Sequence, residues 1–335
     1  MMATYVKGRV APSASAAVLL AIGVAVLAPE VVAPGSKIVF DHSPQLHVAM
    51  TTFAAMCVQA LPLVIAGALV SASITRWMNP SRWAKVIPRS RLGGVLVGAF
   101  AGVFVPTCEC SSVAVARRMV ASGVRPGSAL TFMVAAPSLN PLIVVSTFIA
   151  FGQMEMAIAR WLAALFAVVF VGLVVSVYNS QIIDEIQNRI EETESHGCGC
   201  CSSHRWLDTA KSDVIASTTY IIVGAGIAAG VSAFLPAEAL AAISSNLWVS
   251  MALMIVIAVI ASLCSLGDAF VAASFVGLSP VSLLVFLVVG PIIDLKLAAM
   301  MEGMMGPLTT KVVATAGIIS AILTSTAVSV LMGWI

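Results

Sequence analysis

Long blocks of apolar residues, separated by shorter polar stretches, dominate the chain. A helix needs about 20 apolar residues to cross the hydrocarbon core of a bilayer, and several blocks reach that length. The candidate spans are residues 12–33, 47–75, 92–106, 127–150, 156–178, 212–235, 247–263, 279–301 and 310–333. The pattern therefore predicts an all-α membrane protein with about nine transmembrane segments.

Two stretches do not fit ordinary spans. Residues 107–124 and 264–278 follow short apolar segments, mix Cys, Ser and Gly with apolar residues, and each leads to a proline. Folded-back backbone at membrane depth is tolerated only where protein or a cavity surrounds it. We therefore predict that each stretch is the returning arm of a broken or re-entrant hairpin, which enters and leaves the bilayer on one side.

The charge pattern predicts the orientation. Only 10% of the 335 residues are charged and 60% are hydrophobic, whereas a soluble domain carries about 25% charged residues. Lys and Arg gather in stretches 76–91, 118–126 and 179–211. Because cytoplasmic loops are rich in these residues, we expect a multi-pass inner-membrane protein with these stretches and the N-terminus in the cytoplasm. Arg160, near the predicted outer end of its helix, is the exception.

The two halves of the chain share an internal repeat. Five pairs of positions are separated by the same 154 residues: Cys110 and Cys264, Gly123 and Gly277, Pro126 and Pro280, Pro137 and Pro291, and Asn140 and Asp294. In the predicted orientation the two halves are inverted. Inverted repeats with interrupted helices are typical of secondary transporters, whose solute site lies near the midplane. We expect such an architecture, with the tips at 107–112 and 263–268 facing each other.

The repeat suggests a division of the chain into four parts. An N-terminal helix, taken as uncleaved, and an outer loop occupy residues 1–46. The first repeat half is 47–178, a cytoplasmic loop containing Cys and His is 179–211, and the second half is 212–335.

The two tips are the first candidate for a solute site. They combine thiols, hydroxyls and carboxylates in an apolar setting: Cys108, Glu109, Cys110 and Ser111 in one, and Cys264, Ser265 and Asp268 in the other. Thiolates select soft ions, and a buried carboxylate is costly unless it has a function. The alternative is structural, because cysteine also packs as a small apolar residue.

Asn140 and Asp294 extend this candidate site into the following spans. Asn140 lies between two prolines, which remove backbone donors and free carbonyl groups, so it either lines a path or marks a kink. Asp294 is an intramembrane charge and hence a functional candidate. Lys296, two residues on, either pairs with it or extends to the inner interface. Glu109, Asp268 and Asp294 are candidates for proton coupling.

The polar loop carries the densest group of metal-ligating residues. Its members are His196, Cys198, Cys200, Cys201 and His204. Thiolate and imidazole ligands suit a soft or borderline metal or metalloid, although a linker with incidental cysteines has the same composition. No cofactor is expected apart from such an ion, and no phosphate-binding glycine loop indicates ATP use.

The tip motifs resemble those of the ArsP/YraQ-type permease family. The resemblance rests on Pro106-Thr107-Cys108-Glu109-Cys110-Ser111-Ser112, Gly123-Val124 and Ala135-Ala136-Pro137-Ser138-Leu139-Asn140-Pro141, and covers roughly residues 47–335. It implies a membrane permease, with some family members linked to efflux of trivalent organoarsenicals and related metalloids in arsenic resistance. The family often has a plain C-S-C or C-x-C at the first tip, where this chain has Glu109 between its cysteines.

Together these features favour a secondary permease, not an enzyme, that exports a thiophilic small solute from the cytoplasm. The solute would be a trivalent organoarsenical, a metalloid or a soft metal ion. The alternatives are a transporter of a sulfur-containing small molecule and a membrane thiol or metal-handling redox protein without transport. The expected partners are the lipid bilayer and the solute. A net charge of +2 gives no reason to expect nucleic acid, and a homodimer is compatible with the sequence.

Overall fold

The computed structural model describes residues 90–105, 109–195, 246–262, 265, 267–275 and 278–334. Within these ranges all regular structure is helical, which confirms the all-α prediction. The predicted spans 12–33, 47–75 and 212–235 lie outside the described residues. The total of nine segments therefore stays a prediction.

In the described part of the chain, five helices of the first half are followed by a polar helix and then by five helices of the second half. The first set is α6 (Arg91–Phe104), α7 (Glu109–Ala121), α8 (Pro126–Ser138), α9 (Pro141–Phe151) and α10 (Met154–Val177). The polar helix is α11 (Asn179–Ser195). The second set is α14 (Leu247–Ala261), α15 (Asp268–Ser274), α16 (Pro280–Ile292), α17 (Leu295–Met304) and α18 (Pro307–Leu331).

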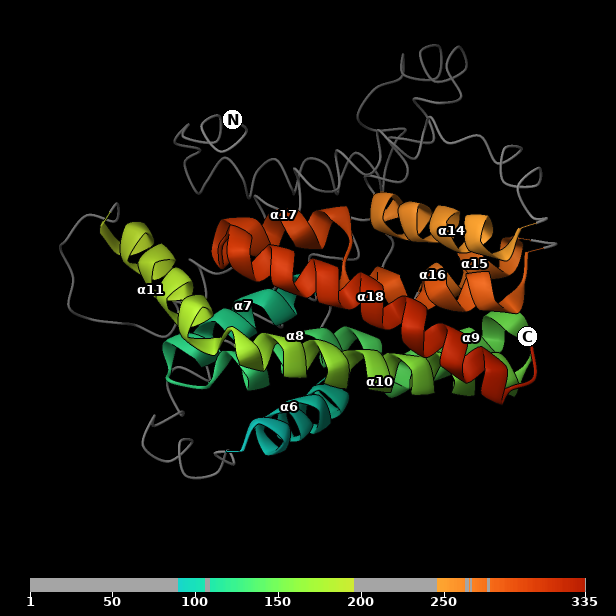
Figure 1. Cartoon of the computed structure of the whole chain (residues 1–335), viewed down its shortest axis with the longest axis horizontal. Coiled ribbons are helices and arrows are strands. Elements are labelled where there is room, and N and C mark those ends of the chain that lie inside the picture. The colour runs from blue at the N-terminus through green and yellow to red at the C-terminus, as the bar shows by residue number, and fades with distance from the viewer. Residues whose placement is uncertain are drawn as a thin grey trace, which may run out of the picture.

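The sequence repeat is also a repeat of structure. Helices α8 and α16 begin 154 residues apart, and so do α9 and α17. Figure 1 shows that α8 and α9 run along the long axis of the molecule in one direction, and α16 and α17 in the opposite direction. Helices α10 and α18 pack against each other and are also antiparallel (Figure 1). The described part of the chain therefore confirms the predicted inverted arrangement.

Four apolar stretches among the described residues are long enough to cross a membrane. Two of them are the single helices α10 and α18. The other two are helix pairs, α8 with α9 over Pro126–Phe151 and α16 with α17 over Pro280–Met304. These four agree with the predicted spans 127–150, 156–178, 279–301 and 310–333, while the shorter α6 and α14 fall on 92–106 and 247–263.

Each helix pair is broken at its P-x-x-[ND] motif. In the first pair Pro137 lies near the end of α8, Asn140 caps α9 by accepting a hydrogen bond from the Leu142 amide, and a proline opens α9. In the second pair Asp294 caps α17 in the same way. Proline removes a backbone donor, and Asn and Asp are favoured N-caps. The motif therefore makes a complete break instead of the mere kink that was one alternative.

The two predicted returning arms are short helices. Helix α7 has 13 residues and α15 has 7, which corresponds to about 20 Å and about 10 Å of axial length, against about 30 Å for a bilayer core. Each arm packs against the second half of the other repeat's broken helix, α7 against α17 and α15 against α9. These packing contacts between the two repeats position the site described below.

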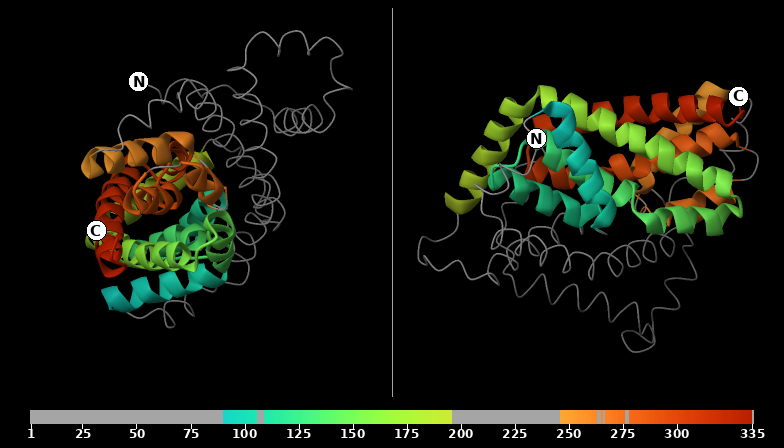
Figure 2. Two further views of the ribbon diagram at one scale, coloured as in Figure 1. Left: turned by 90° about the vertical axis from the view of Figure 1, so that its right-hand side faces the viewer. Right: turned by 90° about the horizontal axis from the view of Figure 1, so that it is seen from below.

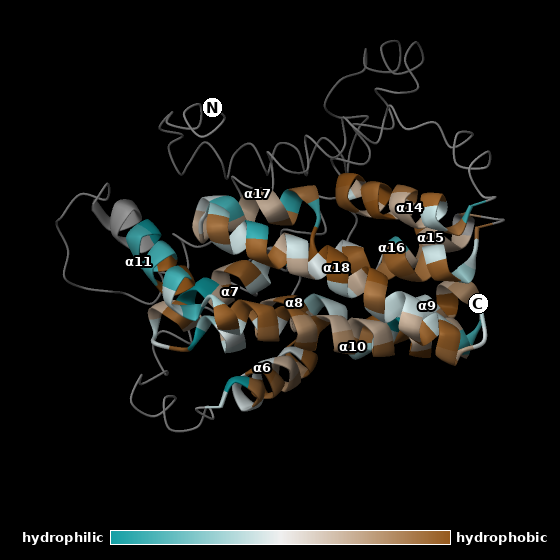
Figure 3. Cartoon of the chain, viewed as in Figure 1, coloured by the Kyte–Doolittle hydropathy of each residue, from teal (hydrophilic) through white to brown (hydrophobic). Residues whose placement is uncertain are grey.

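The outer face of the bundle is apolar. Helices α6 and α14 lie at opposite edges in Figure 1 and Figure 2, and both expose large apolar side chains such as Phe100 and Trp248. Figure 3 shows hydrophobic colouring along most helices and hydrophilic colouring on much of α11. Such a surface suits contact with lipid, so the bilayer is the medium of this fold.

Helix α11 is tied to the ends of two spans. Asn179 accepts a hydrogen bond from the Gly127 amide at 2.9 Å, at the start of α8. Glu185 accepts hydrogen bonds from the amides of Leu308 at 2.8 Å and Thr309 at 2.9 Å, at the start of α18. These acceptors satisfy amides that a helix start leaves without an intrahelical partner. The N-terminal part of the predicted 179–211 loop is therefore an ordered helix.

Close packing of α6 on α8 depends on small residues. A Cβ atom at Gly98 would collide with the backbone carbonyl oxygen of Ser128. We expect Gly98→Val to lower the free energy of unfolding by about 1–3 kcal/mol, the usual cost of overpacking. Thermal unfolding in detergent measures this, with Leu96→Val as the control because Leu96 is 50% exposed on the same helix. Equal melting temperatures for wild type and Gly98→Val would contradict the close contact between α6 and α8.

Candidate solute and ion site at the helix breaks

An ion pair joins the first residue of α7 to the second residue of α17. The Lys296 Nζ atom donates a hydrogen bond to Glu109 Oε2 at 3.3 Å, and both side chains are buried. Glu109 opens its helix, where the dipole favours a negative charge. Because Glu109 belongs to the first repeat and Lys296 to the second, this pair connects the two halves.

Asp294 is the second carboxylate beside Lys296. Its Oδ1 atom accepts a hydrogen bond from the Leu297 amide at 2.5 Å, and its Oδ2 atom lies 3.6 Å from Lys296 Nζ. Residues two apart on one helix do not face each other, but Asp294 is the N-cap with extended backbone and lies before the helix. Lys296 is thus paired inside the protein, and the alternative that it extends to the inner interface is wrong.

Lys296 also contacts the end of the second hairpin's first helix. Its backbone amide donates a hydrogen bond to Ser262 Oγ at 3.4 Å. Ser262 ends α14 with a left-handed backbone (φ 46°), which turns the chain toward the second tip. Glu109 of the first tip and Ser262, which directly precedes the second tip, therefore contact the same lysine. This juxtaposition agrees with the expectation that the tips face each other.

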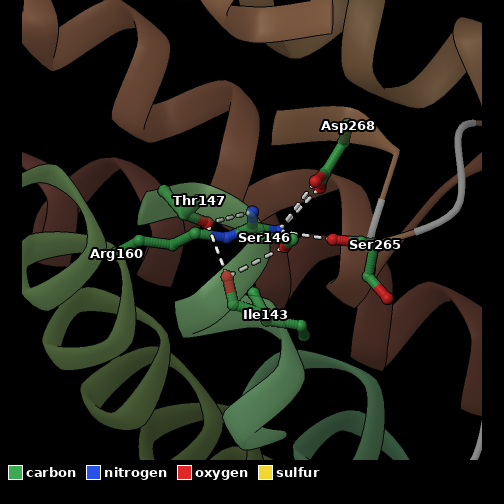
Figure 4. A network of polar contacts seen from close by, with 6 residues as sticks. All are labelled: Ile143, Ser146, Thr147, Arg160, Ser265 and Asp268. Atoms are coloured by element: carbon green, nitrogen blue, oxygen red, sulfur yellow. Dashed lines mark hydrogen bonds and ion pairs between the residues drawn. The ribbon is translucent and has the colours of Figure 1, made fainter. Parts of the chain in front are cut away.

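A second ion pair across the repeats lies between α10 and α15. The Arg160 Nη2 atom donates to Asp268 Oδ1 at 3.0 Å and Oδ2 at 2.8 Å, and to the Ser265 carbonyl oxygen at 3.1 Å. The Nη1 atom donates to Thr147 Oγ1 at 2.9 Å. Figure 4 shows the guanidinium group between α9 and the start of α15. Arg160 and Asp268 are each only 2% exposed, so this is a buried, charge-matched pair.

Arg160 is a site residue that the sequence patterns did not predict. In the sequence it stands out only as an exception to the distribution of cytoplasmic charge. A signal was present, because an arginine within an apolar span requires a buried partner and Asp268 is one of few intramembrane acids in the other half. Ser265, predicted as a ligand, contributes its backbone carbonyl to this network.

The remaining predicted site residues either take no part in the two ion pairs or lie outside the described ranges. Ser111 is buried near the start of α7. Asn140 is half-buried and its side-chain oxygen caps α9 at 3.0 Å from the Leu142 amide, so a role in solute binding stays a prediction. Cys110 lies in α7, but its side chain is not among those described. The residues outside the described ranges are Cys108, Cys264, His196, Cys198, Cys200, Cys201 and His204.

The two buried clusters differ in charge. Arg160 and Asp268 balance each other, whereas Lys296 lies between two carboxylates. Removing one partner of a buried ion pair leaves an uncompensated charge, which is strongly unfavourable. The clusters therefore hold the two repeats together, and any motion of one repeat past the other must exchange these contacts. Among the described residues no group of three or more His, Cys, Asp or Glu is arranged to hold a metal ion.

Comparison with known proteins places the chain among membrane permeases. The ArsP family model, whose description is "Predicted permease", matches residues 45–333. A Streptococcus mutans protein described as a "putative two-component membrane permease complex subunit" is 28% identical over 274 residues, which cover 79% of this chain and 89% of the relative. The UPF0718 protein YcgR of Bacillus subtilis is 32% identical over 258 residues, 74% of this chain and 86% of the relative. No solved structure matches.

Proposed function

The chain belongs to the ArsP family of predicted permeases, and from this premise we propose that it exports a thiophilic small solute from the cytoplasm. The solute would be a trivalent organoarsenical, a related metalloid or a soft metal ion. The sequence contains no ATP-binding glycine loop, so transport would be secondary, driven by an ion gradient or through a partner.

The observation that carries this proposal is the meeting of the two repeats at Lys296. The lysine contacts Glu109 from the first hairpin and Ser262 from the second. In the sequence Cys110 directly follows Glu109, and Cys264 lies between Ser262 and Ser265. Thiolates are the protein ligands that soft centres prefer. A solute held at this point would be bound by both repeats, as alternating access around a midplane site requires.

The Cys/His loop is the proposed collecting site. It follows α11, which is tied to the starts of α8 and α18, and the charge distribution predicts that it lies in the cytoplasm. Cargo captured there by Cys198, Cys200 and Cys201 would be delivered to the transport path at its inner end. The relative described as a subunit of a two-component membrane permease complex suggests a second subunit as a partner, beside the homodimer that the sequence also allows.

Two alternatives use the same thiols differently. A sulfur-containing solute would be held by weak S–H contacts, and a redox protein would cycle the thiols without moving any solute. Cells lacking an exporter become sensitive to its cargo, whereas loss of an uptake permease gives the opposite growth phenotype. A redox protein would show thiol oxidation cycles and no transport into vesicles.

Transport in everted membrane vesicles tests the proposal. Uptake of methylarsenite, Cu(I) and Zn(II) would be compared for wild type, Cys110→Ser, Cys264→Ser and a variant with serine at all three loop cysteines. We expect either tip substitution to lower uptake by about tenfold or more, since loss of a ligand or its support typically weakens metal binding by that factor. Cys57→Ser, which removes a thiol far from both tips in sequence, is the matched control. Equal uptake by wild type and both tip variants would contradict the proposed thiol site.

A further inference from the structure

We propose that Arg160 is a positioning residue for the solute site, because its guanidinium group holds the second tip in a fixed place against the first repeat. It acts through Ser265 and Asp268 and has no contact of its own with the solute. This inference rests on the proposed transport function. It assigns to a residue of the continuous span α10, outside both tips, a role in how tightly the solute is bound.

The guanidinium group of Arg160 joins α9 to the second tip. Its Nη1 atom donates to Thr147 Oγ1 at 2.9 Å, which anchors the group to the first repeat. Its Nη2 atom donates to the Ser265 carbonyl oxygen at 3.1 Å and to Asp268 Oδ2 at 2.8 Å, both in the second repeat. A planar group with several donors in fixed directions suits such a bridge. Arg160 thus sets where the second tip lies relative to α9.

Arg160 holds Ser265 by its backbone. Figure 4 shows the Ser265 carbonyl oxygen directed toward the guanidinium group and the Ser265 hydroxyl group directed away from it. The arginine therefore fixes this residue without using its side chain, which is a predicted solute ligand. In the sequence Ser265 directly follows Cys264, the proposed thiol ligand, which lies outside the described residues. Ligating groups need support of this kind, because small displacements of their atoms weaken binding.

The carboxylate of Asp268 is the second point of attachment. Asp268 is the first residue of α15 and accepts hydrogen bonds from Arg160 at both oxygens. Helix α15 has only 7 residues and no side-chain hydrogen bond at its N-cap, and so short a helix has little stability of its own. Its direction therefore depends on its neighbours. Attachment at both Ser265 and Asp268 fixes the place and the direction of this returning arm.

Helix α10 is a suitable support because it is continuous over 24 residues. The residue after Arg160 makes a similar contact with the first repeat. Trp161 Nε1 donates to the Leu139 carbonyl oxygen at 3.3 Å, at the break between α8 and α9. Adjacent residues of one uninterrupted helix thus hold the backbone of an interrupted segment in each repeat. Sites held by such regular elements are more precise than sites held by loops alone.

A conservative variant separates positioning from the mere presence of a buried ion pair. Arg160→Lys keeps a positive charge beside Asp268, so the carboxylate is not left without a cation. The ammonium group is a single nitrogen atom in place of the guanidinium fork. It cannot bridge Thr147 in the first repeat and the Ser265 carbonyl in the second as the fork does. Thr147→Val is the second variant, because it removes the anchor on α9 and leaves Arg160 and Asp268 in place.

Two measurements test the proposal, one with solute and one without. Methylarsenite uptake by everted vesicles would be followed against methylarsenite concentration for wild type, Arg160→Lys and Thr147→Val. Arg91→Lys, the same change at an exposed arginine on α6, is the matched control. In a background with all seven cysteines replaced, spin labels attached through Phe270→Cys on α15 and Phe166→Cys on α10 would report the distance between the arm and its support. Both labelled positions are exposed.

We expect Arg160→Lys to raise the half-saturating methylarsenite concentration by about tenfold, the usual effect of removing a group that orients a ligand. The maximal rate should fall by a smaller factor. Thr147→Val should shift the half-saturating concentration in the same direction, and Arg91→Lys should leave it within about twofold of wild type. The distribution of label distances should broaden with Arg160→Lys and with Thr147→Val, and should keep its wild-type width with Arg91→Lys.

An unchanged half-saturating concentration in folded Arg160→Lys, or a loss of maximal rate alone, would overturn the inference. Label distances equal to those of the wild type in both variants would overturn it as well. If Arg160→Lys does not fold, Thr147→Val decides the question by the same two measurements. Absence of saturable uptake by the wild type would instead contradict the proposed methylarsenite transport, and the label distances would still decide whether Arg160 fixes the arm.

Discussion

Replacing Arg160 with methionine is expected to destabilise the protein by about 3–5 kcal/mol, the usual cost of removing one partner of a buried ion pair. The guanidinium group donates hydrogen bonds to both oxygens of the Asp268 carboxylate, and both residues are 2% exposed. Methionine fills similar volume but leaves the carboxylate without a cation. Thermal unfolding of the detergent-solubilised protein would measure the change.

A double variant provides the control for Arg160. Substituting Asp268→Leu together with Arg160→Met removes both charges, and apolar replacement of a whole buried pair is often neutral. We expect the double variant to regain most of the lost stability, which gives a large coupling energy in a double-mutant cycle. A melting temperature for Arg160→Met equal to that of wild type would show that the two side chains do not form this pair.

Replacing Lys296 with methionine is expected to have the largest effect on transport. The change leaves Glu109 and Asp294 buried without the ammonium group that lies 3.3 Å and 3.6 Å from their oxygens. The two buried carboxylates then repel each other unless one takes up a proton, and in either case the ion pair that joins the repeats is lost. We expect methylarsenite uptake by everted vesicles to fall about a hundredfold, which corresponds to a free-energy difference of about 2.7 kcal/mol.

The comparison for Lys296 is a lysine on the neighbouring span. Lys311→Met removes the same charge from an exposed position on α18, and uptake should stay within about twofold of wild type, as for surface substitutions away from a site. Adding Glu109→Gln to Lys296→Met removes the repulsion between the two carboxylates but not the loss of the lysine, so uptake should stay low. Wild-type uptake by Lys296→Met would remove the lysine from the mechanism.

The breaks in the spans were predictable because their causes are local. Pro137 and Pro291 each lie near the end of a first half-helix, and Asn140 and Asp294 are natural caps for the second. The spacing of 154 residues fixed the correspondence of the two halves. The short arms were predictable from their mixed polarity between two apolar segments.

The charge partners were not predictable, because they depend on how the repeats pack. Arg160 and Asp268 are 108 residues apart in the chain, and Lys296 and Glu109 are 187 apart. Charges are absent from the equivalent repeat positions, so the repeat itself gave no indication of the pairing. Residues two apart on one helix do not face each other, and this rule spoke against a pair between Asp294 and Lys296. The rule does not apply here, because the helix begins between the two residues.

Intramolecular cross-linking of Cys110 to Cys264 tests most directly whether the two hairpins meet inside the bilayer. The other five cysteines would be replaced with serine, a protease site would be placed in the 205–211 stretch, and a short bifunctional thiol reagent would be applied to membranes. We predict that cleaved, denatured protein then migrates as one species, whereas a control pair of Cys110 with Ile319→Cys, on the exposed face of α18, separates into two fragments. Separation of the Cys110–Cys264 protein into two fragments as complete as that of the control would contradict the account.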